Sequence, residues 1–229
     1  MLSAIIVAAG SSRRMGFDKL RADLLGRPVL AWTVAAFEAC AAMADIVLLT
    51  RAGDEPELAQ LVAREKFAKV RAIRAGGAAR HLSVWNGLNA LEPAAKFVAV
   101  HDGARPLTTP ALIERCLARA REMGAACAAA PVSDTLKRAD PRTQHIVGSV
   151  DREQLWGMQT PQVFALPLLR RAYESVLASG ETVTDEASAV ERLGEPVALV
   201  ASDEPNFKIT YPRDLELARL VLAARKAEI

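Results

Sequence analysis

Short apolar runs alternate along the chain with longer segments in which apolar positions recur at helical spacing. The β-capable apolar runs cover residues 4–9, 46–50, 70–74, 97–101 and 125–130. Helical spacing predicts helices over residues 29–40, 57–66, 83–91, 110–123, 166–178, 185–193 and 212–227. Strands that alternate with helices are typical of an α/β fold with a mostly parallel sheet. We therefore predict a Rossmann-like sheet flanked by helices, in a single domain spanning residues 1–229.

Residues 134–152 interrupt this alternation. The stretch Ala-Asp-Pro-Arg-Thr-Gln at 139–144 has the composition of a turn, and short runs able to pair as strands flank it. Such a hairpin has no obvious place in a parallel sheet. The pattern predicts a β-arm that projects from the domain.

Charge and cysteine content narrow the class of protein. The 29 Lys and Arg residues against 27 Asp and Glu leave a net charge of +2, which gives no reason to expect a nucleic acid or an anionic membrane as partner. Cys40, Cys116 and Cys127 have neither paired nor metal-ligand spacing, as expected for free thiols in a reducing compartment. No basic segment precedes the apolar start at 4–9, so we expect no signal peptide and a cytoplasmic protein.

The first candidate site is the loop Ala-Ala-Gly-Ser-Ser-Arg-Arg-Met at 8–15, which follows the first predicted strand directly. Small residues let backbone N–H groups approach phosphate oxygens, while Arg14 and Lys19 would neutralise a triphosphate. The loop matches neither the dinucleotide-binding glycine pattern nor a P-loop. An ordinary strand-to-helix turn with solvated basic residues is the alternative.

The second candidate is His-Asp-Gly-Ala-Arg-Pro at 101–106, where the fourth predicted strand ends. Ligands of open α/β sheets bind at the carboxyl ends of strands, so Asp102 could hold Mg²⁺ and Arg105 could contact a phosphate. A salt-bridged turn is the competing interpretation. His101 is expected to be a packed strand residue.

Three further motifs say little about function when each is taken alone. They are Asp151-Arg152 with Thr160-Pro161-Gln162, Thr184-Asp185-Glu186, and the expected strand at 206–210 that carries Lys208. Thr184 is most simply interpreted as a helix N-cap, and Lys208 could lie on a solvated face.

The motifs become specific in combination. AAGSSRRM with a following Lys, GG…S at 76–83, HDGARP, PVSDTLKR, VDR…TPQ, TDEAS and KITYPRDL occur in one order and spacing. Together they closely resemble the 2-C-methyl-D-erythritol 4-phosphate cytidylyltransferase family of the non-mevalonate isoprenoid pathway. The resemblance runs from Ala4 to about Ala218, and it implies a fold of the nucleotide-diphospho-sugar transferase type.

The resemblance also implies roles for individual residues. CTP would be bound by Ala8, Ala9, Gly10, Arg14 and Lys19, with Gly77 and Ser83 near the cytosine, and Asp102 would coordinate Mg²⁺. The sugar phosphate would be surrounded by Arg105, Thr135, Arg152, Thr160, Thr184 and Lys208, with Lys208 also near the reacting phosphate. The arm at 134–152 would form a homodimer and deliver Thr135 and Arg152 to the partner subunit's site.

The expected reaction is attack of a phosphate monoester oxygen on the α-phosphorus of CTP, with pyrophosphate leaving. Arg14, Lys19, Lys208 and Mg²⁺ would screen the repulsion between two anions, and no covalent intermediate is required. A cytidylyltransferase acting on another polyol phosphate, such as ribitol 5-phosphate, and a non-catalytic nucleotide-binding regulatory dimer are the alternatives. Because the chain ends soon after its last predicted helix, we expect no fused cyclase domain.

Overall fold

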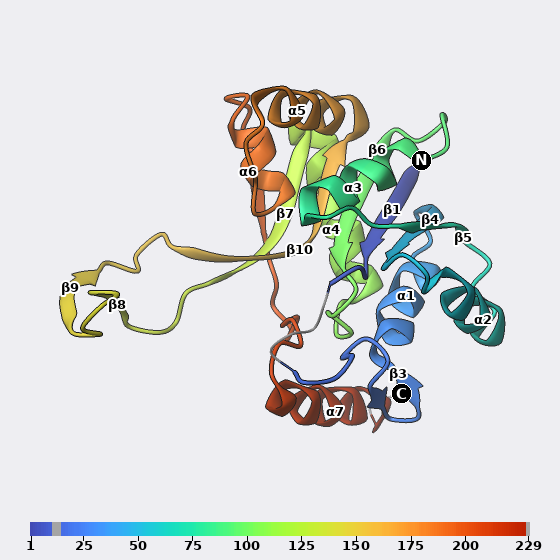
Figure 1. The fold of residues 1–229 in the computed structure, drawn as a ribbon, viewed down its shortest axis with the longest axis horizontal. Coiled ribbons are helices and arrows are strands. Elements are labelled where there is room, and N and C mark those ends of the chain that lie inside the picture. Colours follow the sequence, from blue (N-terminus) through green and yellow to red (C-terminus); the bar gives the residue numbers. More distant parts are fainter. Residues whose placement is uncertain (11–14, 228–229) are drawn as a thin grey trace.

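The computed structural model of the chain describes residues 1–10 and 15–227, and a seven-stranded sheet forms its centre (Figure 1). The strand order is β11-β7-β10-β6-β1-β4-β5. Its strands are β1 (Leu2–Val7), β4 (Met43–Thr50), β5 (Val70–Ala75), β6 (Phe97–Asp102), β7 (Ala125–Pro131), β10 (Trp156–Ala165) and β11 (Ala198–Ala201). β10 runs antiparallel to both of its neighbours, and the other pairings in the sheet are parallel. The predicted mostly parallel sheet is therefore confirmed.

Helices cover both faces of this sheet. They are α1 (Val29–Ala39), α2 (Glu55–Glu65), α3 (Arg80–Asn89), α4 (Pro110–Met123), α5 (Leu166–Ser179) and α6 (Glu186–Glu191), and a further helix, α7 (Pro212–Ala227), lies beyond one end of the sheet (Figure 1). Successive strand residues point to opposite faces, so Ile6 packs with α1 and α4 whereas Ile5 packs with α3, α5 and α6. A third apolar cluster joins α7 to the short hairpin of β2 (Asp23–Leu24) and β3 (Arg27–Pro28) through Leu24, Leu215 and Ile209.

A separate hairpin of β8 (Leu136–Ala139) and β9 (Ile146–Val150) lies outside the main sheet and extends to one side in Figure 1. The Asp140 side chain accepts hydrogen bonds of 2.8 Å from the backbone N–H groups of Arg142 and Thr143, which closes its turn. Ile146 and Val147 are 68% and 65% exposed. Within the described residues, the arm therefore carries apolar side chains that the chain itself leaves uncovered.

Most predicted elements lie within a few residues of the observed ones, but one strand expected inside residues 15–227 is absent and two observed strands of the main sheet were not predicted. The segment 206–210 is not a strand, because Ile209 donates to Ala104 and its neighbours bond mainly to side chains. β10 and β11 were not predicted, since β10 carries Pro161 in its interior and β11 is only four residues long.

His101 is a fully buried strand residue, as expected. Cys40, Cys116 and Cys127 are buried and free. No helix in the described part of the chain is both long enough and apolar enough to cross a membrane.

Candidate functional site

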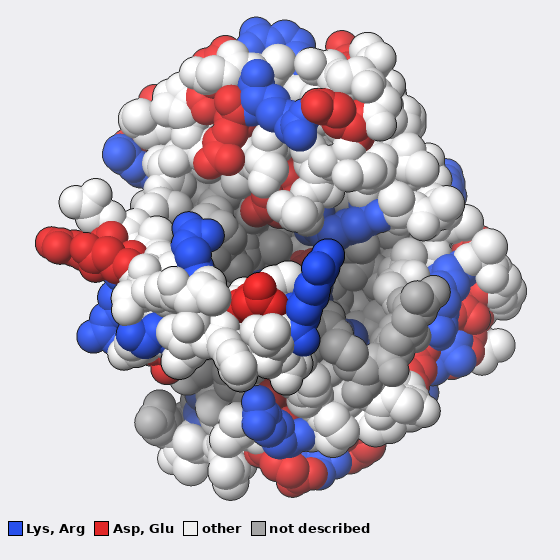
Figure 2. All heavy atoms as spheres, turned by 60° about the vertical axis from the view of Figure 1, so that its left-hand side comes forward, with Lys and Arg blue, Asp and Glu red and all other residues white. Residues whose placement is uncertain are grey.

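The carboxyl ends of β1, β4, β5 and β6 meet at one edge of the sheet, because these four strands are parallel neighbours. Ala8 follows β1, Gly76 follows β5, and Asp102 ends β6. The loops of both sequence-predicted motifs therefore come together in space. Figure 2 shows one hollowed face of the molecule, where basic and acidic side chains are mixed around the depression.

Asp102 is the centre of a cluster of charged side chains. Its carboxylate lies 3.1 Å from Lys208 Nζ, 3.3 Å from Arg105 Nε and 3.7 Å from Arg80 Nη2. Burial raises the pKa of Asp102, but Lys208, Arg80 and Arg105 lower it more, so the pKa lies well below its ordinary value. The carboxylate is therefore ionised at neutral pH.

Arg80 is a member of this cluster that no sequence motif predicted. It begins α3 and makes two hydrogen bonds, of 2.5 and 3.0 Å, to the carboxylate of Glu186, which is fully buried at the start of α6. Tyr173 donates to the same carboxylate at 2.9 Å. Burial works to lower the pKa of Arg80, but the Glu186 carboxylate raises it above its ordinary value. A lone basic residue at the start of a helix carries no signal of this role, whereas the TDEAS motif already contained its partner Glu186.

Thr160 connects β10 to the end of β6. Its hydroxyl accepts a hydrogen bond of 3.1 Å from the backbone N–H of Asp102, and it lies 2.9 Å from Nδ1 of His101. Burial lowers the pKa of His101 to about 3, so this imidazole is neutral. Thr160 is itself buried and positions the backbone of Asp102. Its predicted contact with the sugar phosphate stays a prediction.

The Gly76-Gly77 turn lies against the loop that follows β1. A Cβ atom at Gly76 would lie 2.6 Å from Cβ of Ala9 and 2.8 Å from Oγ of Ser83, so only glycine allows this close approach. The hydroxyl of Ser83 accepts from the N–H of Gly77 at 3.0 Å and fixes the turn. Ala9, Gly77 and Ser83, all expected to contact the nucleotide, are therefore brought together by this turn.

Lys19 contacts the extended segment 206–210, to which Lys208 belongs. Lys19 Nζ donates to the carbonyl of Ile209 at 2.7 Å, and Lys208 is the ion-pair partner of Asp102. Arg105 donates to the carbonyl of Asn206 at 2.8 Å, which holds the same segment against β6. Gly10, in the loop that follows β1, is exposed, and Arg14 lies outside the described residues.

The residues expected around the sugar phosphate do not all gather at Asp102 within this chain. Thr135 and Arg152 are exposed at the two ends of the hairpin arm, and Arg152 donates to the carbonyl of Ser133. Thr184 is exposed, but it is not the N-cap that the sequence suggested. Asp185 caps α6, because its carboxylate accepts from the N–H of Ser188 at 3.0 Å.

The residues at Asp102 fit a magnesium ion that is held mainly by a substrate. Within residues 1–10 and 15–227, no cluster of three or more His, Cys, Asp or Glu side chains is placed to hold a metal alone. Mg²⁺ commonly binds through one or two carboxylates together with substrate phosphates. The Asp102 carboxylate offers a metal one protein ligand, and the cationic side chains around it would repel a bare cation. A metal ion bound to a polyphosphate would be accepted more easily, because the phosphate oxygens supply its other ligands and the negative charge.

Comparisons with known proteins agree on one family. The family model for 2-C-methyl-D-erythritol 4-phosphate cytidylyltransferase matches residues 2–224. The protein of that name from Acaryochloris marina is 43% identical over 223 residues, which are 96% of this chain and 94% of that protein. The one from Synechocystis is 40% identical over 226 residues, 98% of each chain.

Solved structures give the same result. The 4-diphosphocytidyl-2C-methyl-D-erythritol synthase from Anaerococcus prevotii has a TM-score of 0.84 at 31% identity and covers 97% of this chain and 96% of its own. The 2-C-methyl-D-erythritol 4-phosphate cytidylyltransferase from Thermus thermophilus has a TM-score of 0.80 at 34% identity, with 97% and 100% covered. The similarity therefore extends over nearly the whole chain, in sequence and in fold.

Proposed function

Because the chain belongs to the 2-C-methyl-D-erythritol 4-phosphate cytidylyltransferase family, we propose that the charged cluster around Asp102 is where it joins its two phosphate-bearing substrates. The chain transfers CMP from CTP to 2-C-methyl-D-erythritol 4-phosphate, giving 4-(cytidine 5'-diphospho)-2-C-methyl-D-erythritol and pyrophosphate. This is a step of the non-mevalonate isoprenoid pathway. One observation carries the assignment of the site: Lys208, Arg105 and Arg80 all lie within 3.7 Å of the Asp102 carboxylate.

The chemistry needs charge neutralisation more than it needs a base. An oxygen of the sugar phosphate forms a bond to the α-phosphorus, and the bond from that phosphorus to the bridging oxygen of pyrophosphate breaks. A phosphate dianion is nucleophilic at neutral pH, so the protein's task is to bring two anions together. Lys208, which pairs with Asp102, and Lys19, which donates to the carbonyl of Ile209, would supply preorganised positive charge, and Arg14 would add to it.

Mg²⁺ is part of this proposal. Asp102 would hold it together with phosphate oxygens of CTP, and the ion would supply further positive charge to the reacting phosphates. Lys208 and Arg105 keep the Asp102 carboxylate ionised, and Mg²⁺ would share that carboxylate with them or replace one of their contacts. Gly10 and the backbone of Ala8 and Ala9 are expected to face the nucleotide.

The test of the site is pyrophosphate release from CTP, measured with 2-C-methyl-D-erythritol 4-phosphate and with ribitol 5-phosphate. We expect turnover with the first substrate, and a loss of about 100-fold or more in kcat/KM for Lys19→Ala, Lys208→Ala and Asp102→Asn. Arg171→Ala on α5, which removes an exposed ion pair with Glu195, is the matched control and should keep full activity. Near-native rates in any of the three variants would remove that residue from the mechanism.

We further propose a homodimer in which the arms exchange. Two copies related by a two-fold axis would cover Ile146 and Val147 and would bring Thr135 and Arg152 to the partner's site. We also propose a cytoplasmic location, because free thiols are typical of a reducing compartment and CTP is a cytoplasmic metabolite.

Mixed dimers test the shared site. Arg152→Ala should inactivate the neighbouring site, and Lys19→Ala should inactivate its own, so heterodimers of the two variants keep one intact site. Random 1:1 mixing should restore about a quarter of wild-type activity. Verified heterodimers without any recovery, or an active monomer in sedimentation, would overturn the exchange.

A further inference from the structure

Lys19 lies between two anchored neighbours. On its C-terminal side Leu20 is only 8% exposed, and its carbonyl accepts a hydrogen bond of 3.1 Å from the N–H of Leu30. On its N-terminal side Asp18 accepts from the N–H of Leu20 at 3.1 Å through Oδ1. The position of the Lys19 backbone therefore depends on what holds Leu20 and what holds Asp18.

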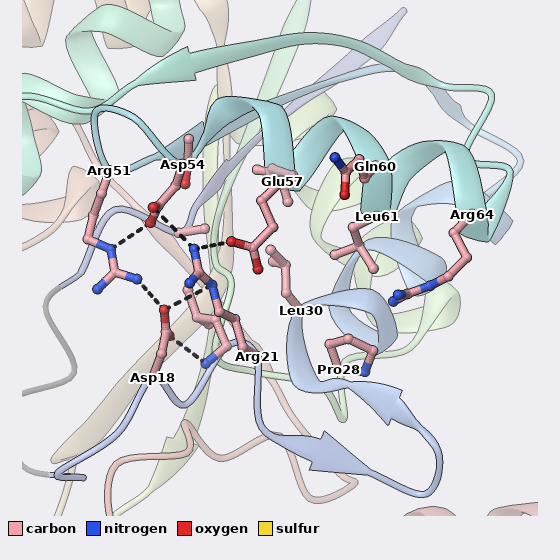
Figure 3. Close-up of a pocket in the computed structure, with 14 residues that line it drawn as sticks. Asp18, Arg21, Pro28, Leu30, Arg51, Asp54, Glu57, Gln60, Leu61 and Arg64 are labelled. Atoms are coloured by element: carbon pink, nitrogen blue, oxygen red, sulfur yellow. Dashed lines mark hydrogen bonds and ion pairs between the residues drawn. The ribbon is translucent and has the colours of Figure 1, made fainter.

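Asp18 is held by a closed ring of ion pairs, made of Asp18, Arg21, Arg51 and Asp54 (Figure 3). Oδ2 of Asp18 contacts Arg51 Nη2 and lies 3.4 Å from Arg21 Nε. Asp54 completes the ring, because its two carboxylate oxygens lie 2.9 Å from Arg51 Nε and 3.1 Å from Arg21 Nη2. Acid and base alternate around the ring, so each member has two oppositely charged neighbours.

The ring connects three parts of the fold that are distant in sequence. Asp18 and Arg21 belong to the segment before β2, Arg51 directly follows β4, and Asp54 precedes α2. Glu57 on the first turn of α2 adds a contact of 2.7 Å to Arg21. β4 is a neighbour of β1 in the sheet, and the nucleotide loop follows β1. The ring therefore connects the Lys19 segment to the strand beside the one that carries this loop.

Packing alone does not hold Asp18 in place. The ring borders a pocket of about 310 Å³ that reaches from Ala8 to α2, and the apolar lining of that pocket comes from Leu20, Leu30, Leu58 and Leu61. The side chain of Asp18 is 18% exposed at the edge of this space. The ion pairs, and not close packing, therefore hold the side chain of Asp18 in position.

We propose that the ion-pair ring of Asp18, Arg21, Arg51 and Asp54 positions Lys19 for phosphate binding, an inference that rests on the role proposed for Lys19. Asp18 and Arg51 are positioning residues, since they act through Lys19 and not on the substrate. A displacement of about 1 Å at a reacting group can cost about 100-fold in rate. Leu20 still anchors one side when the ring is broken, so we expect an intermediate loss.

The test is a double-mutant cycle in kcat/KM for CTP. Asp18→Asn removes the charge but keeps an amide oxygen able to accept from the N–H of Leu20, so it breaks the ring without removing that turn contact. We expect it to lower kcat/KM about 10-fold, with the KM for the sugar phosphate changed less than about 2-fold. Arg51→Gln should give a similar loss, and the double variant should be little worse than either single one.

The decisive arm uses Lys19→Ala as background. If the ring acts through Lys19, Asp18→Asn should lower kcat/KM in the wild type but leave the residual rate of Lys19→Ala unchanged. Glu122→Gln, which removes an exposed pair with Arg119 on α4, is the control and should have no effect in either background. Thermal unfolding of each variant checks that the fold persists, and Arg51→Gln repeats the comparison if Asp18→Asn does not fold.

The outcomes separate the two proposals. Full activity of Lys19→Ala would remove Lys19 from the mechanism and leave the ring without the role proposed for it, whereas the Asp102 site is tested separately by Asp102→Asn and Lys208→Ala. A large loss in Lys19→Ala with normal activity in Asp18→Asn and Arg51→Gln would overturn the ring proposal alone. An equal loss from Asp18→Asn in both backgrounds would also overturn it, because the ring would then act on something other than Lys19.

Discussion

Replacing Glu186 with Ala tests how strongly the buried end of the charged cluster supports the fold. Glu186 is fully buried, and its carboxylate accepts two hydrogen bonds from Arg80 and one from the Tyr173 hydroxyl. Removing one partner of a buried ion pair costs ~3–5 kcal/mol, because the other charge is left without compensation. The side chain of Arg80 is 27% exposed and can regain some hydration, which reduces our expectation to ~3 kcal/mol.

Thermal unfolding measures this cost. In a chain of this length each kcal/mol lowers the Tm by ~2–4 °C, so Glu186→Ala should unfold roughly 6–12 °C below the wild type. Glu204→Ala is the matched control, because its 2.6 Å pair with Arg225 leaves Glu204 61% exposed. An exposed pair of this kind is worth about 1 kcal/mol or less.

A second substitution separates the two partners of Glu186. Tyr173→Phe removes one buried hydrogen bond and should cost about 1 kcal/mol alone, but less in the Glu186→Ala background, where the acceptor is already gone. Equal Tm changes for Glu186→Ala and Glu204→Ala would refute the reasoning. So would an undiminished effect of Tyr173→Phe in the double variant.

Three further predictions concern the site. Burial lowers the pKa of His101 to about 3, so below about pH 6.5 the unfolded chain binds a proton at this residue that the folded chain does not bind, and the free energy of unfolding falls. Between pH 7 and pH 5, urea unfolding should show the wild type losing about 2 kcal/mol more than His101→Gln. Equal losses in the two proteins would contradict this. Gly76→Ala would place a Cβ 2.6 Å from Cβ of Ala9, so we expect the KM for CTP to rise about 10-fold while kcat changes less. An unchanged KM would show that the turn can move to make room for the methyl group. The site should prefer CTP to ATP, since a purine is too large for the space expected between the Ala8-Ala9 backbone and Ser83; comparable pyrophosphate release from both nucleotides at equal subsaturating concentration would disprove this.

Local features of the chain could be predicted because near neighbours determine them. The bounds of α4 agree with the prediction at both ends: Pro110 opens the helix, the Thr109 side chain accepts from the N–H of Leu112, and Gly124 ends it with a φ of +83°. The strand β6 and its motif were likewise visible as a short apolar run followed by charged and small residues, whereas the run predicted for β1 at 4–9 is displaced by two residues from Leu2–Val7. The ordered set of motifs identified the family before any contact was known.

The position of β10 in the sheet and the ion pairs between distant segments depend on the three-dimensional arrangement, and no local sequence pattern predicts them. β10 enters between β6 and β7 in the antiparallel direction, and this places Thr160 against the end of β6. Arg80 meets Glu186 across 106 positions of sequence, and Asp18 meets Arg51 across 33. Side-chain periodicity and helix caps arise from residues a few positions apart, so they can be read along the chain. Ion pairs between distant segments depend on strand order, register and loop closure, which are established only when the whole sheet has formed.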